Sequence, residues 1–341
     1  MACKVKAYWQ WLRYTERRVP EGKKLLLMNL DETSISCAPE TRQGLIVVQS
    51  SRQARAVVRT QDSRTNFTYV AVICPDPALQ ETMPHFIIGC KRKVTEAQTQ
   101  ELMNSAQPHV HVWRNGEKAW NNNILMQRIL RVISDAVSHR ADLQPVLILD
   151  VAPCHIHEAV MRKAKSLGIW LVYVPAQVTS LVQPLDTHAF ASFKAWLRQE
   201  YMKLRGKSVD GLVDRLPWLR VLQRARASFF NQRIWTDSFR DTGARVPVSR
   251  LTRALQRFCE PAMARTARAD QPDVNTLSLV WPRNRKTVFA SAALFQPMVR
   301  QVPGHAPAAK RPLPPPGVSI ALASRAHKRA CRQFPSRVFD S

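Results

Sequence analysis

Two short apolar segments constrain the fold most: PVLILD at 145–150, which is apolar up to its final Asp, and IWLVYVP at 169–175. Each has the length of a strand, and each is apolar enough to be covered on both faces of a sheet. The segment between them, 154–167, repeats apolar side chains at helical spacing, and Gly168 follows it as a helix stop. Strand–helix–strand over this length predicts two parallel strands joined by a crossover helix.

The residues before this unit predict strands of a different kind. A continuous apolar run, LLLMNL at 25–30, leads into acidic residues, which is typical of a buried strand that ends at this point. Turn residues separate the strand candidates that follow, and their spacing suggests an antiparallel meander. These candidates are GLIVVQ at 44–49, FTYVAVIC at 67–74, HFIIG at 85–89 and VHVW at 110–113.

Together the segments predict an α/β protein with a mixed sheet, in which an antiparallel meander precedes parallel strands and helices flank both. A mixed five-stranded sheet in that order is the ribonuclease H-like fold. We expect four regions: a basic N-terminal helix at 1–21, the sheet domain at 22–205, an arginine-rich helical extension at 206–260, and a proline-rich basic tail at 261–341, largely disordered. The extension's core candidates are Trp218, Leu222, Phe229, Trp235 and Phe239.

Charge and cysteine usage narrow the function. The chain holds 51 Lys and Arg against 25 Asp and Glu, a net charge of +26, which attracts nucleic acid. Its seven cysteines are scattered without a CxxC pair, which argues against a disulfide framework or a zinc finger. The N-terminus has no signal-peptide core, and no segment approaches about eighteen uncharged apolar residues. We therefore expect an intracellular, nuclear protein whose partner is DNA, with no membrane segment.

Three aspartates fall where the predicted sheet opens. Asp31 follows the LLLMNL strand, Asp150 ends PVLIL, and Asp186 lies at the start of a helix predicted over 190–204. Sites in open α/β sheets form at the carboxyl ends of strands, and carboxylates are the ligands that magnesium prefers. Any one of these acids could equally be a turn residue or a helix cap. All three in this order predict a metal-dependent site for cutting phosphodiester bonds.

The strings around these acids resemble a known family. NLDETS, LILDVAPCH and VPAQVTSLVQPLDTHAFASFKAWLRQEY are similar to the DDE-superfamily endonuclease domain of pogo-, Tigger- and Jerky-like transposases, which are related to mariner-type transposases. The resemblance covers residues 22–205 and continues more weakly to about 245. The family's three acids match Asp31, Asp150 and Asp186.

This resemblance implies a ribonuclease H-like fold and two Mg²⁺ or Mn²⁺ ions held by the three aspartates. It also implies nuclear DNA cleavage and strand transfer, with water and then a DNA 3′-hydroxyl as nucleophiles, by a protein that can form a homo-oligomer on DNA. The sequence departs from the family at Val151, where a polar residue is common. Members usually carry a helix-turn-helix region before this domain, and here the domain begins close to residue 1.

Two other interpretations stay open beside the DDE endonuclease. One is a domesticated or decayed transposase that binds nucleic acid or a protein partner without catalysis, which the missing helix-turn-helix region favours and the intact acids disfavour. The other is an unrelated ribonuclease H-like nuclease acting on RNA or on RNA–DNA hybrids.

Several residues near the acids are candidates for binding nucleic acid. Thr179, Ser180 and Gln183 lie in the loop that leads to Asp186, where their hydroxyl and amide groups could contact phosphates or serve ordinary turns. On the following helix, Lys194 and Arg198 are candidate backbone contacts, with a solvated helix face as the alternative.

Four further residues have mainly structural interpretations. Glu32 adjoins Asp31 on a strand, so its side chain should point to the opposite face and form a salt bridge rather than bind metal. We place His155 at the edge of the site and His157 at the surface, and we expect no cysteine or acid to complete a zinc site with them. Cys154 is expected to be a small buried residue at a helix start.

Overall fold

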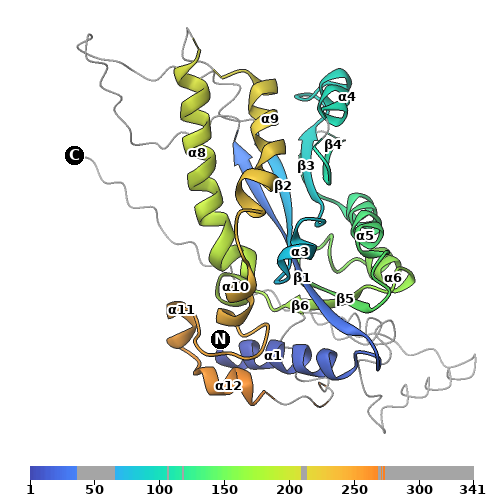
Figure 1. Cartoon of the computed structure of the whole chain (residues 1–341), viewed down its shortest axis with the longest axis vertical. Helices are drawn as coiled ribbons and strands as arrows, with labels where there is room; N and C mark the ends of the chain where they lie inside the picture. The colour runs from blue at the N-terminus through green and yellow to red at the C-terminus, as the bar shows by residue number, and fades with distance from the viewer. Residues whose placement is uncertain are drawn as a thin grey trace, which may run out of the picture. The chain divides into compact units, whose positions relative to one another are not determined.

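The computed structural model describes residues 1–36, 66–105, 107–116, 119–208, 213–267, 270 and 272. Its centre is a six-stranded sheet in the order β4-β3-β2-β1-β5-β6 (Figure 1). The strands are β1 (Lys24–Ser36), β2 (Asn66–Ile73), β3 (His85–Cys90), β4 (Val110–Asn115), β5 (Leu143–Asp150) and β6 (Trp170–Val174).

The sheet is mixed, as predicted. β2 runs antiparallel to both β1 and β3, whereas β5 runs parallel to β1 and β6. Five strands, β3-β2-β1-β5-β6, follow the ribonuclease H-like order. The prediction for 110–113 is partly wrong: these residues do form a strand, but β4 lies parallel to β3 rather than in a meander. The reason is the helix α4 (Glu96–Asn104), which carries the chain back before β4 begins. The predicted strand at 44–49 lies outside the described residues.

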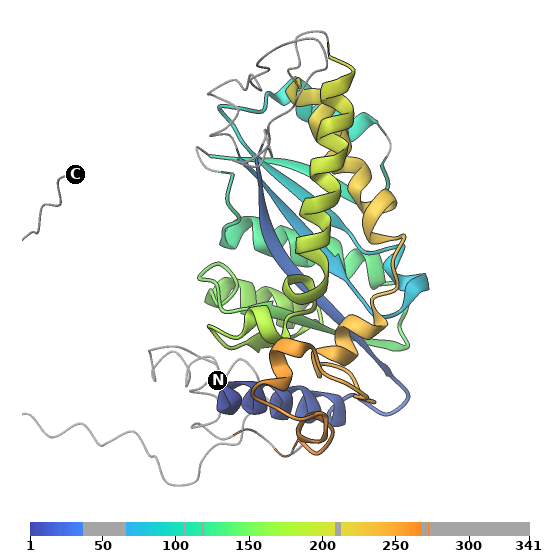
Figure 2. The ribbon, with the colours of Figure 1, turned by 90° about the vertical axis from the view of Figure 1, so that its left-hand side faces the viewer.

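Helices cover the two faces of the sheet. α5 (Asn123–Val137) and α6 (Glu158–Ser166) lie on one face, and α8 (Phe190–Gly206) and α9 (Arg215–Ala225) lie on the other (Figure 2). The amphipathic spacing of α5 places its apolar stripe against the sheet, and Asn122 caps it by accepting hydrogen bonds from two backbone amides. The shorter helices are α3 (Pro77–Gln80), α7 (Thr179–Val182), η1 (Leu185–Ala189), η2 (Arg226–Phe230), α10 (Thr236–Asp241), α11 (Arg253–Gln256) and α12 (Pro261–Arg265).

The N-terminal helix, α1 (Ala2–Arg17), is part of the core rather than a separate basic element. One face packs against β6 and α12, and Trp9 is fully buried. Its indole Nε1 donates to the backbone oxygen of Thr242 at 3.0 Å, and the Arg13 guanidinium donates to that of Gly243 at 2.6 Å. α12 also extends regular structure into the range predicted to be a disordered tail. The residues after 272 lie outside the described part of the chain.

The arginine-rich extension shares its core with the sheet. Its five predicted core residues are all buried. Phe230 stacks on Tyr69 of β2, with ring centroids 5.8 Å apart and an interplanar angle of 8°, and Phe193 of α8 contacts both rings. Arg226 is buried and donates to backbone oxygens, including that of Met83 at 2.8 Å. The extension therefore closes one face of the sheet and uses at least one arginine for that purpose.

Among the described residues, no helix has the length and apolar character needed to cross a membrane.

Candidate active site

Asp31 and Asp150 lie where two parallel strands separate. The register of β1 with β5 ends at the pair Asn29 and Ile148, so the strands diverge just before the two aspartates. Asp150 is the last residue of β5, as predicted. Asp31 does not end its strand, because β1 continues to Ser36 by pairing with β2, where Asp31 lies opposite Ala71. Asp31 still lies at the opening between β1 and β5, because the pairing of these two strands ends at Asn29.

Asp186 lies in η1, a π-helical turn directly before α8. The sequence predicted a helix start at this position, and the wider turn is an arrangement found often at functional sites. Asn29 fixes this turn to the sheet. Its buried side chain accepts a hydrogen bond from the Leu185 amide at 2.9 Å and donates to the Ile148 backbone oxygen at 3.2 Å.

Asn29 therefore joins the three elements that carry the three acids: β1, β5 and η1. It was missed from the sequence. The available signal was a lone polar residue inside the apolar run LLLMNL, where a buried amide needs partners.

The carboxylates of Asp31 and Asp186 lie close enough to interact. Asp31 is 8% exposed, and burial first, then the charge of Asp186, raises its pKa well above the ordinary value, with a smaller contribution from Asp150. The pKa of Asp186 is also raised, mainly by burial and further by the charge of Asp150. Hydrogen bonds with Thr179 and Asp31 and the charge of Lys194 act in the opposite direction. Burial and neighbouring acids thus both disfavour the ionised forms of Asp31 and Asp186.

Asp150 has a partner that the other two acids lack: His155. The Nδ1 of His155 lies 2.5 Å from Oδ1 of Asp150, and its Nε2 lies 3.2 Å from Oε1 of Glu32. Burial by itself disfavours the charged imidazolium, but hydrogen bonds with Asp150, Cys154 and Glu32 raise the pKa of His155 well above its usual value. Burial also raises the pKa of Asp150, but His155 and the amide of Ala152 outweigh this effect and lower it.

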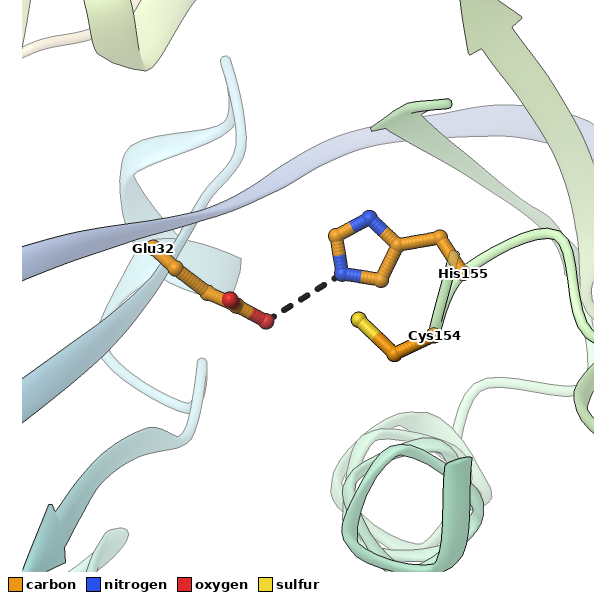
Figure 3. A group of neighbouring side chains, drawn as sticks. All are labelled: Glu32, Cys154 and His155. Carbon is orange, nitrogen blue, oxygen red and sulfur yellow. Dashed lines mark hydrogen bonds and ion pairs between the residues drawn. The ribbon is translucent and has the colours of Figure 1, made fainter. Parts of the chain in front are cut away.

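His155 is therefore buried inside the site rather than at its edge, with a side chain that is 1% exposed. The predicted salt bridge of Glu32 is present, and its partner is this histidine. Within the described part of the chain, Glu32, Cys154 and His155 have ligand atoms that all lie within 4.8 Å of one another (Figure 3). An acid and a cysteine thus do join His155, contrary to the prediction. The three aspartates form no such group.

The candidate nucleic-acid contacts fall into two sets. Lys194 and Arg198 are exposed on α8, and Ser180 is exposed on α7. Thr179 hydrogen-bonds with Asp186, so it orients that acid. Gln183 is fully buried, and its amide has no hydrogen-bond partner among the described residues, so it does not face solvent as a phosphate contact requires. The prediction for Gln183 is wrong, because the loop turns its side chain inward at the end of α7.

The sequence matches a family model described as DDE superfamily endonuclease over residues 66–232. The matched range includes Asp150 and Asp186 and begins after Asp31. No curated protein matches the chain.

Similar solved structures include three Mos1 complexes, each with a TM-score of 0.42. The Mos1 strand transfer complex is 13% identical, covering 70% of this chain and 57% of that one. The mariner Mos1 paired end complex with Mg is 12% identical, covering 71% and 59%. The pre-cleavage Mos1 transpososome is 11% identical, covering 83% and 63%. This chain thus spans less than two thirds of each of these proteins.

Proposed function

We propose that this chain is a DDE-type transposase nuclease domain of the pogo-, Tigger- and Jerky-like group, which cuts DNA by metal-dependent phosphoryl transfer. The observation that carries the proposal is the placement of the three acids: β1 and β5 separate just before Asp31 and Asp150, and Asn29 of β1 ties both β5 and η1, which carries Asp186, to this point. The charges of neighbouring acids contribute to the raised pKa of Asp31 and of Asp186. A cluster of this kind is stabilised by a cation.

The donor set fits a hard divalent ion. All three side chains offer carboxylate oxygens, which suit Mg²⁺ or Mn²⁺. We assign Asp31, Asp150 and Asp186 as the residues that would hold two such ions. Bound there, the ions supply a neutralising charge for the attacking and leaving oxygens of the phosphodiester.

The chain's own residues fix the positions of these carboxylates. Asn29 holds η1 against the two diverging strands, His155 fixes one oxygen of Asp150, and Thr179 bonds with Asp186. The exposed side chains of Lys194 and Arg198 extend the site along α8, where they can meet the phosphate backbone. We further propose that the protein acts in the nucleus and forms a homo-oligomer on DNA.

The test is nicking of supercoiled DNA in Mg²⁺ and in Mn²⁺ by the wild type, by Asp150→Asn and by Asp135→Asn. Asp135 is exposed on α5 and serves as the matched control. We expect the wild type and the control to nick DNA, and we expect Asp150→Asn to lose nicking while it keeps the fold. Equal nicking by Asp150→Asn and the wild type, or none by the wild type in either metal, would refute the proposal.

A second candidate is nucleic-acid binding without cleavage, which the net charge of +26 favours. It predicts salt-dependent DNA binding that is unchanged when Asp31 and Asp186 are both replaced by Asn, together with no nicking. Nicking of an RNA–DNA hybrid in preference to DNA would point instead to a ribonuclease.

A further inference from the structure

Glu32, Cys154 and His155 place three different metal-ligating atoms around one point. Glu32 comes from β1, and the other two come from the loop between β5 and α6 (Figure 3). The carboxylate oxygen, the Sγ and the imidazole nitrogen all lie within 4.8 Å of one another. The Cys154 sulfur points toward the contact between Glu32 and His155. This group is distinct from the three aspartates.

His155 is oriented as a ligating histidine would be. Its Nδ1 faces Asp150 at 2.5 Å, which leaves Nε2 directed at Glu32. Metal-binding histidines commonly donate their second ring nitrogen to a carboxylate in this way, because that bond fixes the ring and its tautomer. The loop is held as well, since the Tyr173 hydroxyl donates to the His155 backbone oxygen at 3.0 Å.

We propose that Glu32, Cys154 and His155 form a zinc site, in addition to the magnesium or manganese site of the proposed function. A thiolate with an imidazole favours zinc over magnesium, which prefers oxygen ligands alone. Ligand atoms around tetrahedral zinc lie roughly 3.3–3.8 Å apart. The three side chains therefore reach this geometry with shifts of about 1 Å, with zinc replacing the hydrogen bond between Nε2 and Glu32.

Glu32 and Cys154 also line a pocket of about 670 Å³, which would leave room for a fourth ligand of the zinc ion. Its other walls include Thr68, Asn121 and the exposed Trp120. Asn121 donates to Oε1 of Glu32 at 2.5 Å and so holds the carboxylate at the pocket floor. Three protein ligands and an open position are the arrangement of zinc sites that take water or an exchangeable ligand.

The test uses the full chain after chelator treatment and dialysis, titrated with Co²⁺ and then with Zn²⁺. We expect a thiolate-to-cobalt charge-transfer band in the near ultraviolet, which about one Zn²⁺ per chain removes. Cys154→Ser should lose the band and bind zinc at least about tenfold more weakly. Cys3→Ser, an exposed cysteine on α1, is the matched control and should keep both properties.

Two further variants keep the result independent of any one substitution. Glu32→Gln should weaken zinc binding, and Asp150→Asn should weaken it about 10- to 100-fold, because it removes the carboxylate behind His155. Circular dichroism checks that each variant is folded. A wild type without the cobalt band, or a Cys154→Ser variant that retains it, would overturn the zinc site.

Nicking in Mg²⁺ is measured separately on the same zinc-stripped protein. A chain that binds zinc but never nicks DNA refutes only the proposed nuclease. A chain that nicks DNA without the cobalt band refutes only the zinc site.

Discussion

The Nδ1 of His155 lies 2.5 Å from Oδ1 of Asp150, and this contact ties the charge of one side chain to that of the other. The ring is almost fully buried, so the bond is poorly screened by water. On its far side the same ring meets Glu32. His155 thus belongs to the group that we assign to zinc and also contacts Asp150, a proposed ligand of the catalytic metals.

Replacing His155 by Gln should lower the free energy of unfolding by about 1–3 kcal/mol, because the partly buried carboxylate of Asp150 loses its cationic partner. The raised pKa of His155 gives a stabilisation that is fully present below about pH 6.5 and is lost as the pH rises through the folded-state value. The lowered pKa of Asp150 gives a stabilisation that is present above about pH 4 and is lost in acid.

The wild type should therefore exceed His155→Gln in stability most clearly between roughly pH 4.5 and 6.5. Urea unfolding of both proteins across this range and up to alkaline pH measures the difference. His139→Gln, at an exposed position after α5, is the control and should change little at any pH. A gap between wild type and His155→Gln that widens as the solution becomes alkaline would contradict the assignment.

Asp31→Asn should stabilise the protein in EDTA, because the ionised carboxylate of Asp31 is buried beside the charges of Asp186 and Asp150. Because the pKa of Asp31 is raised, its carboxyl group contributes stability that is fully present below the ordinary pKa of an aspartate and is lost as the pH rises through the folded-state pKa. The ionised carboxylate therefore costs stability at neutral pH. Asparagine keeps an oxygen that can accept the hydrogen bond from the Glu32 amide.

Thermal unfolding of wild type and Asp31→Asn, with and without Mg²⁺, tests this prediction. Mg²⁺ should raise the midpoint of the wild type, since a ligand of the folded state stabilises it, and should raise that of the variant less. Asp135→Asn should respond to Mg²⁺ as the wild type does. An Asp31→Asn variant that is less stable than the wild type in EDTA would show that Asp31 is not under electrostatic strain.

Most of the sheet could be predicted from the sequence, because its strands are apolar runs of strand length with clear boundaries. The runs at 145–150 and 169–175 and the helix between them became β5, α6 and β6. The direction of β4 could not be predicted. Apolar spacing identifies a strand but does not say how it pairs, and here α4 decided it.

The site was less predictable than the fold, because it depends on contacts between residues far apart in the chain. Spacing and motif placed Asp31, Asp150 and Asp186 in one region. The role of Asn29 depends on contacts 119 and 156 residues away. The pairing of Glu32 with His155 spans 123 residues. Alternation along a strand predicts on which side of the sheet the Glu32 side chain lies, but it does not predict that the side chain contacts His155.

Gly243→Ala should destabilise the protein by about 2–4 kcal/mol, combining the cost of a left-handed backbone with that of overpacking. Gly243 has a φ of +71°, and the space for a Cβ atom is filled by the Trp9 indole of α1. Gly206→Ala is the matched control. It ends α8 in open space, so alanine there should be neutral or stabilising by up to about 1 kcal/mol. Chemical denaturation measures both, and equal effects would show that α1 does not pack on this turn.

Lys194→Ala should weaken binding of duplex DNA and reduce the slope of log affinity against log salt by about 1, because one phosphate contact is lost. Lys194 is exposed on α8, and its charge lowers the pKa of Asp186, so DNA bound at the three acids should pass it. Lys165→Ala is the control, since this exposed lysine lies on α6, across the sheet from α8. Fluorescence anisotropy at several salt concentrations gives both slopes. A smaller slope for Lys165→Ala, with an unchanged slope for Lys194→Ala, would contradict this prediction. It would place the bound DNA on the face of the sheet that carries α6, away from the three aspartates.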